Sequence, residues 1–236
     1  MDLTIKTPFV NVALQTPYAK TIPQINGPYT RIHLIRHCHP DYAIKHLVGD
    51  EKMPLSDLGK KQRKLLNKKL EQIQLDKIYV SELLRSRQTA EDFAKKKKKK
   101  CFTDKRLNEI DWTEWYKIKY FNMSEKTRVK RLPKHRQMDK ELHKMHNKVR
   151  RLLADVYKKN KGKRVGLFCH GNLIRVMITS ILNTDVVGFL STEIYQSSVT
   201  KLVIDRDGYI KINYINNICH LPHKPDEDLF LAALNQ

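Results

Sequence analysis

The segment from Arg31 to Pro40 places a guanidinium next to an imidazole, at Arg36 and His37, and adds two further histidines, His33 and His39. Its largely apolar first half is typical of a buried strand, and Pro40 cannot continue a ladder of hydrogen bonds. In open α/β sheets ligands bind beyond the carboxyl ends of the strands, where Arg36 and His37 are expected. An imidazole can act as a nucleophile and a guanidinium can hold oxygens, so the pair indicates chemistry on an anionic group.

Two later segments also place polar residues directly after an expected strand. Ser81 follows an expected strand at residues 76–80 and leads within about one turn to Arg85, while the run His170-Gly171-Asn172 follows an expected strand at residues 164–169. If the sheet is parallel, all three strand ends lie on one rim. Guanidinium groups and the N–H groups around a glycine at a helix start would then converge on one crevice, which predicts a site for a phosphoryl group.

The histidines also allow a different interpretation. Imidazole is a common metal ligand, so the pattern His33-x-x-x-His37-x-His39 could indicate a metal site. His39 lies past the end of the strand that carries the other two, and no carboxylate motif completes the set. A metal cluster is therefore the less favoured alternative.

Hydrophobic periodicity predicts the elements that position these residues. Ser56 is a suitable N-cap for a helix that buries Leu58, Leu65, Leu66 and Leu70. Between residues 138 and 156, apolar residues at three-to-four spacing predict a helix packed on the body. The turn Asp205-Arg206-Asp207-Gly208 predicts a hairpin. Strands are expected at 31–36, 76–80, 101–103, 164–169, 197–204 and 209–215, and helices at 57–73, 83–94, about 112–161 and 173–182.

Strands that alternate with helices, followed by a hairpin, predict an α/β fold: a three-layer α/β/α sandwich with a mostly parallel central sheet and an antiparallel edge strand. The expected organisation is an extended N-terminal arm at 1–29 and a single domain at 30–223, followed by a C-terminal tail at 224–236. The segment from His39 to Pro54 is expected to be a loop.

Composition limits the functional classes. The 236 residues contain no apolar run long enough to span a membrane and no signal-peptide pattern, so a cytoplasmic protein is expected. The four cysteines are widely separated, which favours reduced thiols, and Cys38 and Cys169 are interpreted as small buried residues. The sequence does not predict an oligomeric state.

The net charge of +21 is concentrated in one region, since residues 95–165 hold 26 Lys and Arg against 8 Asp and Glu. Such a region could attract phosphorylated substrates or nucleic acid, and it could equally be a solvated lysine-rich face. A polyanion-binding protein with little or no catalysis is therefore an open alternative. It is less favoured because the sequence has no nucleic-acid-binding signature.

Six segments, taken together and in order, resemble the motifs of the histidine phosphatase superfamily, also called phosphoglycerate mutase-like. Each is weak alone, but the ordered set runs from about residue 31 to residue 221. The segments are Arg36-His37-Cys38, Pro54 to Gly59, Ser81 to Ala90, Leu107 to Trp112, His170 to Arg175, and Asn216 to Leu221.

The resemblance implies roles for six residues. His37 would be the nucleophile that forms a phosphohistidine, and Glu109 would be the general acid and base. Arg36, Arg85 and His170 would bind the phosphoryl oxygens, joined by the backbone N–H of Asn172. The resemblance implies neither a metal nor another cofactor, and it implies a small phosphorylated substrate. Arg87 and Arg175 are expected on helix surfaces, and His220 in a structural role.

The resemblance has limits. The family usually has glycine after the nucleophilic histidine, a Thr or Ser two positions further on, and an asparagine six residues after the histidine, where this sequence has Cys38, Pro40 and Ala43. The family also includes phosphoglycerate mutase-type phosphotransferases, which carry a longer insertion before the second histidine. Since only 61 positions separate Glu109 and His170, a phosphomonoesterase is favoured, with the basic helical insertion at about 112–161 as its lid.

Overall fold

A computed structural model describes residues 27–110 and 124–222 of the chain. The predicted C-terminal tail at 224–236, almost all of the predicted arm at 1–29, and the first part of the predicted insertion, up to residue 123, lie outside the described residues. The described ranges include the six strands of one sheet and the helices that pack on it.

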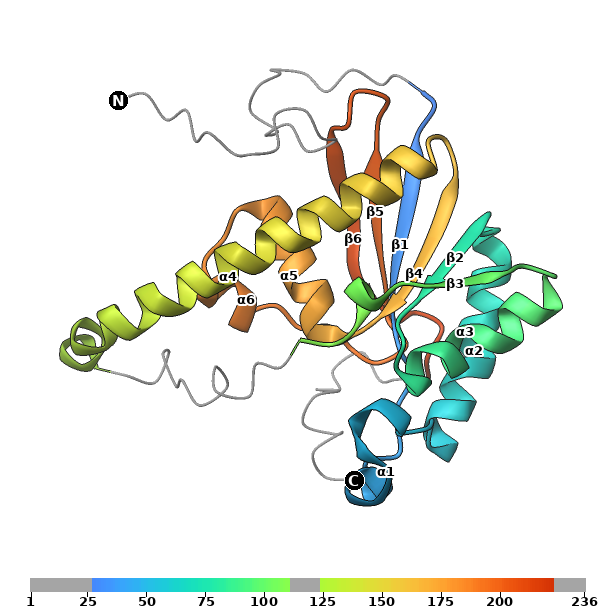
Figure 1. Cartoon of the computed structure of the whole chain (residues 1–236), viewed down its shortest axis with the longest axis horizontal. Coiled ribbons are helices and arrows are strands. Elements are labelled where there is room, and N and C mark those ends of the chain that lie inside the picture. The colour runs from blue at the N-terminus through green and yellow to red at the C-terminus, as the bar shows by residue number, and fades with distance from the viewer. Residues whose placement is uncertain (1–26, 111–123, 223–236) are drawn as a thin grey trace.

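The core of the fold is a six-stranded mixed sheet with the strand order β3-β2-β4-β1-β5-β6 (Figure 1). Strand β1 pairs in parallel with β4, which pairs in parallel with β2, and β2 pairs in parallel with β3. β5 runs antiparallel to β1, and β6 runs antiparallel to β5. The antiparallel strand is therefore β5, one position inside the edge. The strands are β1 (Thr30–Arg36), β2 (Lys77–Val80), β3 (Cys101–Thr103), β4 (Arg164–Cys169), β5 (Val199–Ile204) and β6 (Ile210–Asn217).

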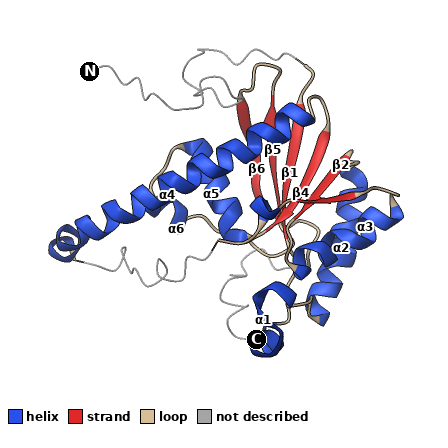
Figure 2. Ribbon diagram, in the orientation of Figure 1, coloured by secondary structure: helices blue, strands red, loops and turns tan. Residues whose placement is uncertain are grey.

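Helices cover both faces of the sheet, so the predicted three-layer sandwich is confirmed (Figure 2). On β1, Ile32 and Leu34 face a core shared with α4 (Glu125–Lys159) and α5 (Gly171–Leu182). Ile35 points to the opposite face, into a second core shared with α2 (Asp57–Ile73) and α3 (Leu84–Lys96). This alternation follows from the period of two along a strand. A short helix, α6 (Val186–Leu190), follows α5 and was not predicted.

The expected loop between His39 and Pro54 is wrong. It contains a 3-10 turn at Tyr42–Ile44 and the helix α1 (Lys45–Lys52), which is interrupted at Gly49, where φ is +74°. None of the residues of α1 is buried. A helix without a buried face has no apolar periodicity, which explains why the sequence pattern did not indicate it.

Helix α2 begins at the predicted N-cap, because Ser56 Oγ accepts a hydrogen bond from the backbone N–H of Gly59 at 3.1 Å. Its buried side differs from the prediction: Leu66 and Leu70 are buried, but Leu58 is 40% exposed. Gly59 faces the body instead, since a Cβ there would lie only 2.0 Å from the carbonyl oxygen of His39. The close approach of this backbone sets the rotation of the helix.

The second half of α4 packs as predicted, with Met138, Leu142 and Val149 buried against the body. Arg150 extends from this helix to the carbonyl oxygen of Ser180 on α5. Among the described residues, no helix combines the length and apolar character that crossing a bilayer would require.

Candidate active site

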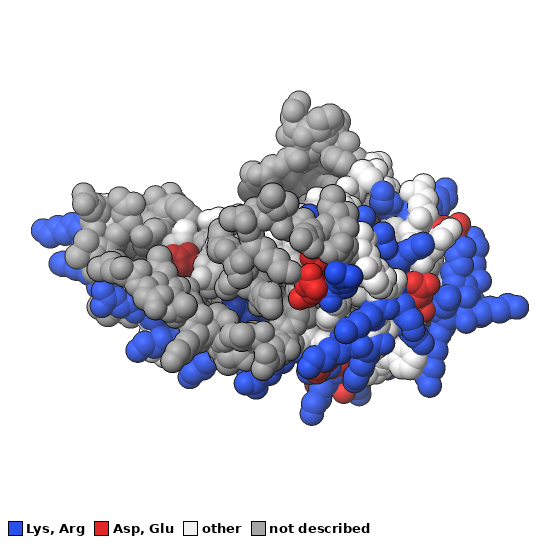
Figure 3. All heavy atoms as spheres, turned by 90° about the horizontal axis from the view of Figure 1, so that it is seen from above, with Lys and Arg blue, Asp and Glu red and all other residues white. Residues whose placement is uncertain are grey.

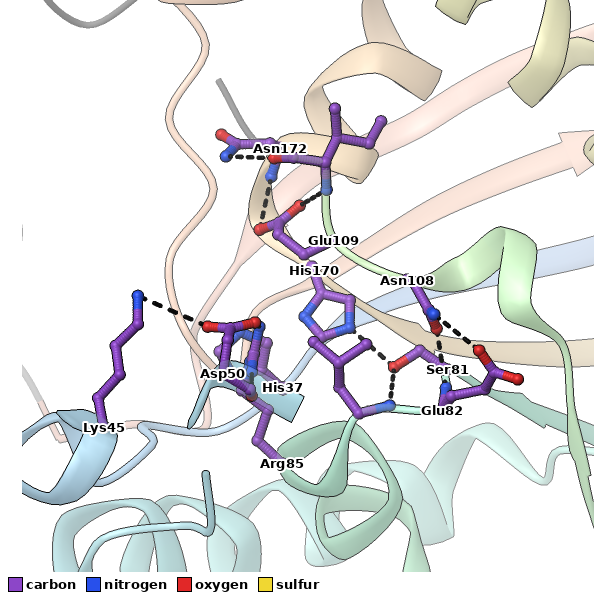
Figure 4. Close-up of polar contacts among 12 residues, drawn as sticks. His37, Lys45, Asp50, Ser81, Glu82, Arg85, Asn108, Glu109, His170 and Asn172 are labelled. Carbon is purple, nitrogen blue, oxygen red and sulfur yellow. Dashed lines mark hydrogen bonds and ion pairs between the residues drawn. The ribbon is translucent and has the colours of Figure 1, made fainter. Parts of the chain in front are cut away.

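The ends of three parallel strands meet at one place, as the sequence predicted (Figure 4). The backbone N–H of His37, just after β1, donates to the carbonyl oxygen of Cys169 at the end of β4 (3.0 Å). The backbone N–H of Ser81, just after β2, donates to Phe168 O at 3.2 Å. The rings of His37 and His170 are 5.0 Å apart between centroids. The strand pairing therefore brings together residues that are more than 100 positions apart in the sequence.

His37 is arranged as a neutral imidazole with one free nitrogen. The ring is buried, and its Nδ1 lies 2.7 Å from the carbonyl oxygen of Cys38. A carbonyl can only accept, so Nδ1 carries the proton and the lone pair is on Nε2. Burial, and then the nearby His170, Arg36 and Arg85, hold the pKa of His37 well below its ordinary value. The neutral form, which is the nucleophilic form, is therefore favoured.

His170 offers a hydrogen-bond donor to the same space. The ring is fully buried, and its Nε2 lies 2.8 Å from Ser81 Oγ. Ser81 Oγ accepts from the backbone N–H of Leu83 at 3.3 Å, and its hydroxyl proton has no other acceptor among the described residues, so we assign that proton to His170 Nε2. Nδ1 then carries the ring proton, and in the described part of the chain this buried atom has no partner. Burial, followed by Arg85 and Arg36, lowers the pKa of His170.

Arg36 has a second buried donor without a partner. One terminal nitrogen donates to the carbonyl oxygen of Ile194 at 2.5 Å, which fixes the side chain. Its Nε is buried and makes no hydrogen bond within the described residues. The guanidinium lies against Gly171, the first residue of α5, where a Cβ would be 3.1 Å from both Cζ and Nε. A glycine at this position allows the close approach of Arg36 to the start of the helix.

Replacing Gly171 with alanine is therefore expected to displace the Arg36 guanidinium by a few tenths of an ångström. If Arg36 binds the phosphoryl group, KM for a phosphomonoester should rise by about tenfold, which corresponds to roughly 1.4 kcal/mol of binding. Steady-state kinetics on the purified variant would measure this change, and Gly188→Ala on α6 provides the control for an alanine at a crowded helical glycine. An unchanged KM in Gly171→Ala would show that the position of Arg36 is not critical.

Arg85 is held by an acidic residue that sequence analysis missed. Its two terminal nitrogens donate to the backbone carbonyl oxygen of Asp50 (2.7 Å) and to Asp50 Oδ2 (3.0 Å). Lys45 approaches the other carboxylate oxygen at 3.7 Å, so Asp50 lies between two cations (Figure 4). Arg85 is buried, whereas Asp50 is 46% exposed. The only signal in the sequence is the acidic residue after Gly49 on a segment that leaves the expected rim.

The Glu109 side chain contacts the first residues of α5, next to the strand ends. Its carboxylate accepts from three backbone N–H groups, those of Ile110 (2.9 Å), Leu173 (3.2 Å) and Asn172 (3.4 Å). Burial raises the pKa of Glu109, and these hydrogen bonds together with Arg36 oppose the rise without reversing it. The side chain is thus suited to carry a proton under conditions in which an ordinary glutamate would have lost it.

The segment before Glu109 is fixed to the loop after β2. Asn108 accepts from the backbone N–H of Glu82 and donates to its carboxylate, both at 2.9 Å. This pair was not predicted. It connects the segment before Glu109 to the loop that carries Ser81 and leads to Arg85.

Three other predicted residues lie on α3 and α5. The N–H of Asn172, predicted to bind phosphate, is directed at Glu109 in this structure. Arg87 is exposed as expected, but the surface position predicted for Arg175 is wrong: it is 7% exposed and pairs with Glu193 at 3.0 Å. α5 is covered by the sheet and by α4, so even its polar positions are enclosed.

The remaining alternatives concern histidines and cysteines. His220 Nε2 lies 3.0 Å from Ser197 Oγ, next to the backbone that contacts His37, which is a structural position. Within the described ranges no three His, Cys, Asp or Glu side chains are grouped so that they could hold a metal ion, so His33, His37 and His39 do not form a cluster. All four cysteines are free. Burial raises the pKa of Cys38 to about 12, in agreement with its interpretation as a buried structural residue.

Comparison with known families agrees with this geometry. The sequence model of the histidine phosphatase superfamily (branch 1) matches residues 32–217, which include every residue described above as part of the site. The chain therefore belongs to the histidine phosphatase superfamily.

The individual proteins that the chain resembles are named as phosphatases. Phosphoserine phosphatase 1 of Hydrogenobacter thermophilus is 27% identical over 205 residues, which cover 81% of this chain and 94% of that protein. A mutant phosphoserine phosphatase from Entamoeba histolytica, solved with phosphoserine, has a TM-score of 0.63 at 21% identity, covering 82% of this chain and all of the other. Mycobacterial glucosyl-3-phosphoglycerate phosphatase, solved with VO3, has a TM-score of 0.59 at 20% identity, covering 80% and 99%. Family and relatives agree that the enzyme is a phosphatase.

Proposed function

We propose that the chain is a metal-independent phosphomonoesterase that hydrolyses small phosphorylated metabolites through a phosphohistidine at His37. The observation that carries the proposal is a set of unused polar groups on residues at the neighbouring carboxyl ends of β1 and β4. Arg36 Nε and the assigned N–H of His170 Nδ1 are buried donors without partners in the described part of the chain, and the lone pair of His37 Nε2 is available beside them. A phosphoryl group would satisfy the two donors and meet the nucleophile.

In the first step, His37 Nε2 forms a bond to phosphorus as the bond from phosphorus to the ester oxygen breaks. The leaving oxygen takes the proton of Glu109, whose raised pKa favours the protonated form. Arg36, Arg85 and His170 bind the non-bridging oxygens and stabilise the charge of the in-line transition state. The cationic side chains thus supply the charge that a metal ion supplies in other phosphatases.

In the second step, Glu109 is a carboxylate and takes a proton from water. The resulting hydroxide attacks phosphorus, the bond from phosphorus to His37 Nε2 breaks, and the pair of electrons returns to the ring. Inorganic phosphate leaves and both residues regain their starting protonation. A phosphoglycerate mutase-type enzyme would differ here, because a second substrate hydroxyl would replace water.

The proposed substrates are small phosphate esters, with phosphoserine as the first to test. Support comes from the relative named phosphoserine phosphatase 1 and from solved phosphoserine phosphatase structures containing phosphoserine or 3-phosphoglyceric acid. The lysines and arginines of the insertion expected at about 112–161 would favour anionic substrates. A cytoplasmic location stays a prediction.

The proposal is tested by measuring the hydrolysis of phosphoserine, 3-phosphoglycerate and p-nitrophenyl phosphate with and without a chelator. Equal rates in both conditions are expected, together with inhibition by vanadate, which resembles pentacoordinate phosphorus. A strict requirement for a divalent cation would contradict the mechanism, and transfer of phosphate to an added phosphoglycerate without hydrolysis would favour the mutase.

Replacing Asp50 with asparagine is expected to improve substrate binding. The Asp50 carboxylate occupies Arg85 Nη2, which a phosphoryl oxygen would otherwise use, so an incoming phosphate must compete with it. Asp50→Asn removes the charge while its backbone carbonyl can still hold the second nitrogen of Arg85. KM for phosphoserine and the inhibition constant of phosphate should each fall by roughly threefold to tenfold, with kcat little changed.

The matched control for this variant is Asp57→Asn, an exposed aspartate that pairs with Lys60 at the start of α2. A rise in KM in Asp50→Asn would contradict the competition and would indicate that the carboxylate is needed to hold Arg85 in place.

A further inference from the structure

Along β1, the side chains on the sheet face under α2 and α3 change from apolar to basic. At the carboxyl end of the strand, Ile35 is fully buried with Phe168 and Val199 in an apolar core. Because side chains alternate along a strand, Arg31 and His33 point to the same face as Ile35. Toward the amino end of β1, basic residues therefore occupy positions that an enclosed sheet face usually fills with apolar side chains.

A groove of about 290 Å³ opens at this place, between the sheet and the end of α2. Its lining combines strand residues that are direct neighbours in the register, since Arg31 pairs with Arg164 and His33 pairs with Lys201. Lys69 on α2 completes the set of cations, and the lining residues include no carboxylate in the part of the chain that the structure describes. Four positive charges thus surround one small space.

His33 contributes a buried polar ring to this groove. It is 3% exposed, it lines the groove, and its Nδ1 has no hydrogen-bond partner among residues 27–110 and 124–222. Burial, and then the charges of Lys201, Arg31 and Arg164, lower the pKa of His33 to about 4. The ring is neutral at physiological pH, and a bound anion would raise this pKa because it would favour the protonated form.

A second groove, of about 230 Å³, shares Arg164 with the first and adds Lys97 and Lys99, which follow α3. The one carboxylate in its lining, Asp76, accepts from the backbone N–H of Arg164 at 2.8 Å. The Arg164 guanidinium itself donates to neutral oxygens, at 2.8 Å to Gln74 Oε1 and at 3.5 Å to Ile73 O. Viewed from this end of the molecule, Lys and Arg crowd the half of the surface that holds α2 and α3, with few acidic residues between them (Figure 3).

Six cations and one carboxylate line these two grooves, which share Arg164, so the cations repel one another until an anion binds. A single phosphate would neutralise only part of this charge and would fill only one groove. We propose that the two grooves on either side of this shared residue, Arg164, together bind a small anion with two or more phosphoryl groups in one chain. Arg31 lies five residues before Arg36 on β1, or about 16 Å at the usual rise per residue, so this site is separate from the one around His37.

The test titrates the full-length protein with inorganic tripolyphosphate, with ATP, and with a single-stranded oligonucleotide, at physiological salt. The ring signals of His33 in NMR spectra report on the groove itself, whereas calorimetry would also detect binding at His37. Both small anions should shift the His33 signals and raise its pKa from about 4. Similar affinities would identify the phosphate chain as the recognised group, and tighter binding of ATP would identify a nucleotide.

The variant Lys69→Gln/Lys201→Gln should weaken this binding by about tenfold or more, because two of the cations around His33 are removed. The control Lys144→Gln/Lys148→Gln removes the same charge from exposed positions on α4, on the other side of the sheet, and should retain the affinity. Equal losses in the two variants would overturn the proposal, as would binding of the oligonucleotide alone. Phosphatase activity is measured separately, so failure here leaves the proposed function standing.

Discussion

Replacing His37 with alanine is expected to reduce kcat for phosphoserine by at least about 10⁴-fold, because the nucleophile that divides the reaction into two steps is removed. The wild-type enzyme, mixed with a labelled substrate and quenched, should carry acid-labile phosphate on His37. The variant should carry none. The remaining cations Arg36 and Arg85 would still bind phosphate, so KM is expected to change much less than kcat.

The matched control is His39→Gln. His39 is half-buried two positions further on, and its Nδ1 lies 2.8 Å from Ser56 Oγ, which is a structural contact at the rim. Its activity should remain within a few-fold of wild type. Circular dichroism and the midpoint of thermal unfolding would establish that both variants fold. Label retained in His37→Ala, or lost in His39→Gln, would contradict the assignment of the nucleophile.

Most residues of this site could be predicted because they lie close to a strand end. His37, Ser81 and His170 follow apolar runs that the sequence indicates clearly, and a parallel sheet brings such ends to one rim. Glu109 does not follow such a strand. It was proposed from its resemblance to a family segment alone, and the structure shows why pattern could not find it: its position depends on the N–H groups at the start of α5, more than 60 residues later.

Asp50 and Arg175 illustrate what local patterns omit. Asp50 lies on α1, a helix with no buried residues, and its contact with Arg85 depends only on tertiary structure. Arg175 was expected on the helix surface, but its side chain pairs with Glu193 and lies over the ring of Phe189 on α6, so it is enclosed. The rotation of α2 was missed for a similar reason, because the backbone of His39 against Gly59 outweighs the preference of Leu58 for burial.

The pH dependence of the first chemical step follows from two pKa shifts. His37 must be neutral, and since its pKa is lowered by burial and nearby cations, activity is retained on the acid side until pH falls through that lowered value. Glu109 must be protonated, and since burial raises its pKa, activity is lost as pH rises through that raised value. The rate of phosphorylation of His37 should therefore be highest at a pH between these two values.

Replacing Glu109 with glutamine is expected to slow the first step only for substrates whose leaving group needs a proton. The alkyl oxygen of phosphoserine is a poor leaving group and needs a general acid, so its turnover should fall by about 10³-fold. p-Nitrophenolate leaves without a proton, so p-nitrophenyl phosphate should still phosphorylate His37 rapidly. The variant has no carboxylate to activate water, so hydrolysis of the phosphohistidine becomes slow and p-nitrophenol should appear in a burst of one equivalent.

Rapid-quench kinetics with both substrates would measure this difference. Asn108→Ala is the informative partner variant: it removes the contacts with Glu82 that hold the segment before Glu109, but retains the acid. Asn108→Ala should slow both steps modestly, and its activity should still fall at high pH. In Glu109→Gln this fall at high pH should be absent. Equal losses on the two substrates in Glu109→Gln, without a burst, would mean that Glu109 positions α5 and does not transfer the proton. The raised pKa of Glu109 favours proton transfer, because a group that only anchors a helix start is most effective when it is ionised.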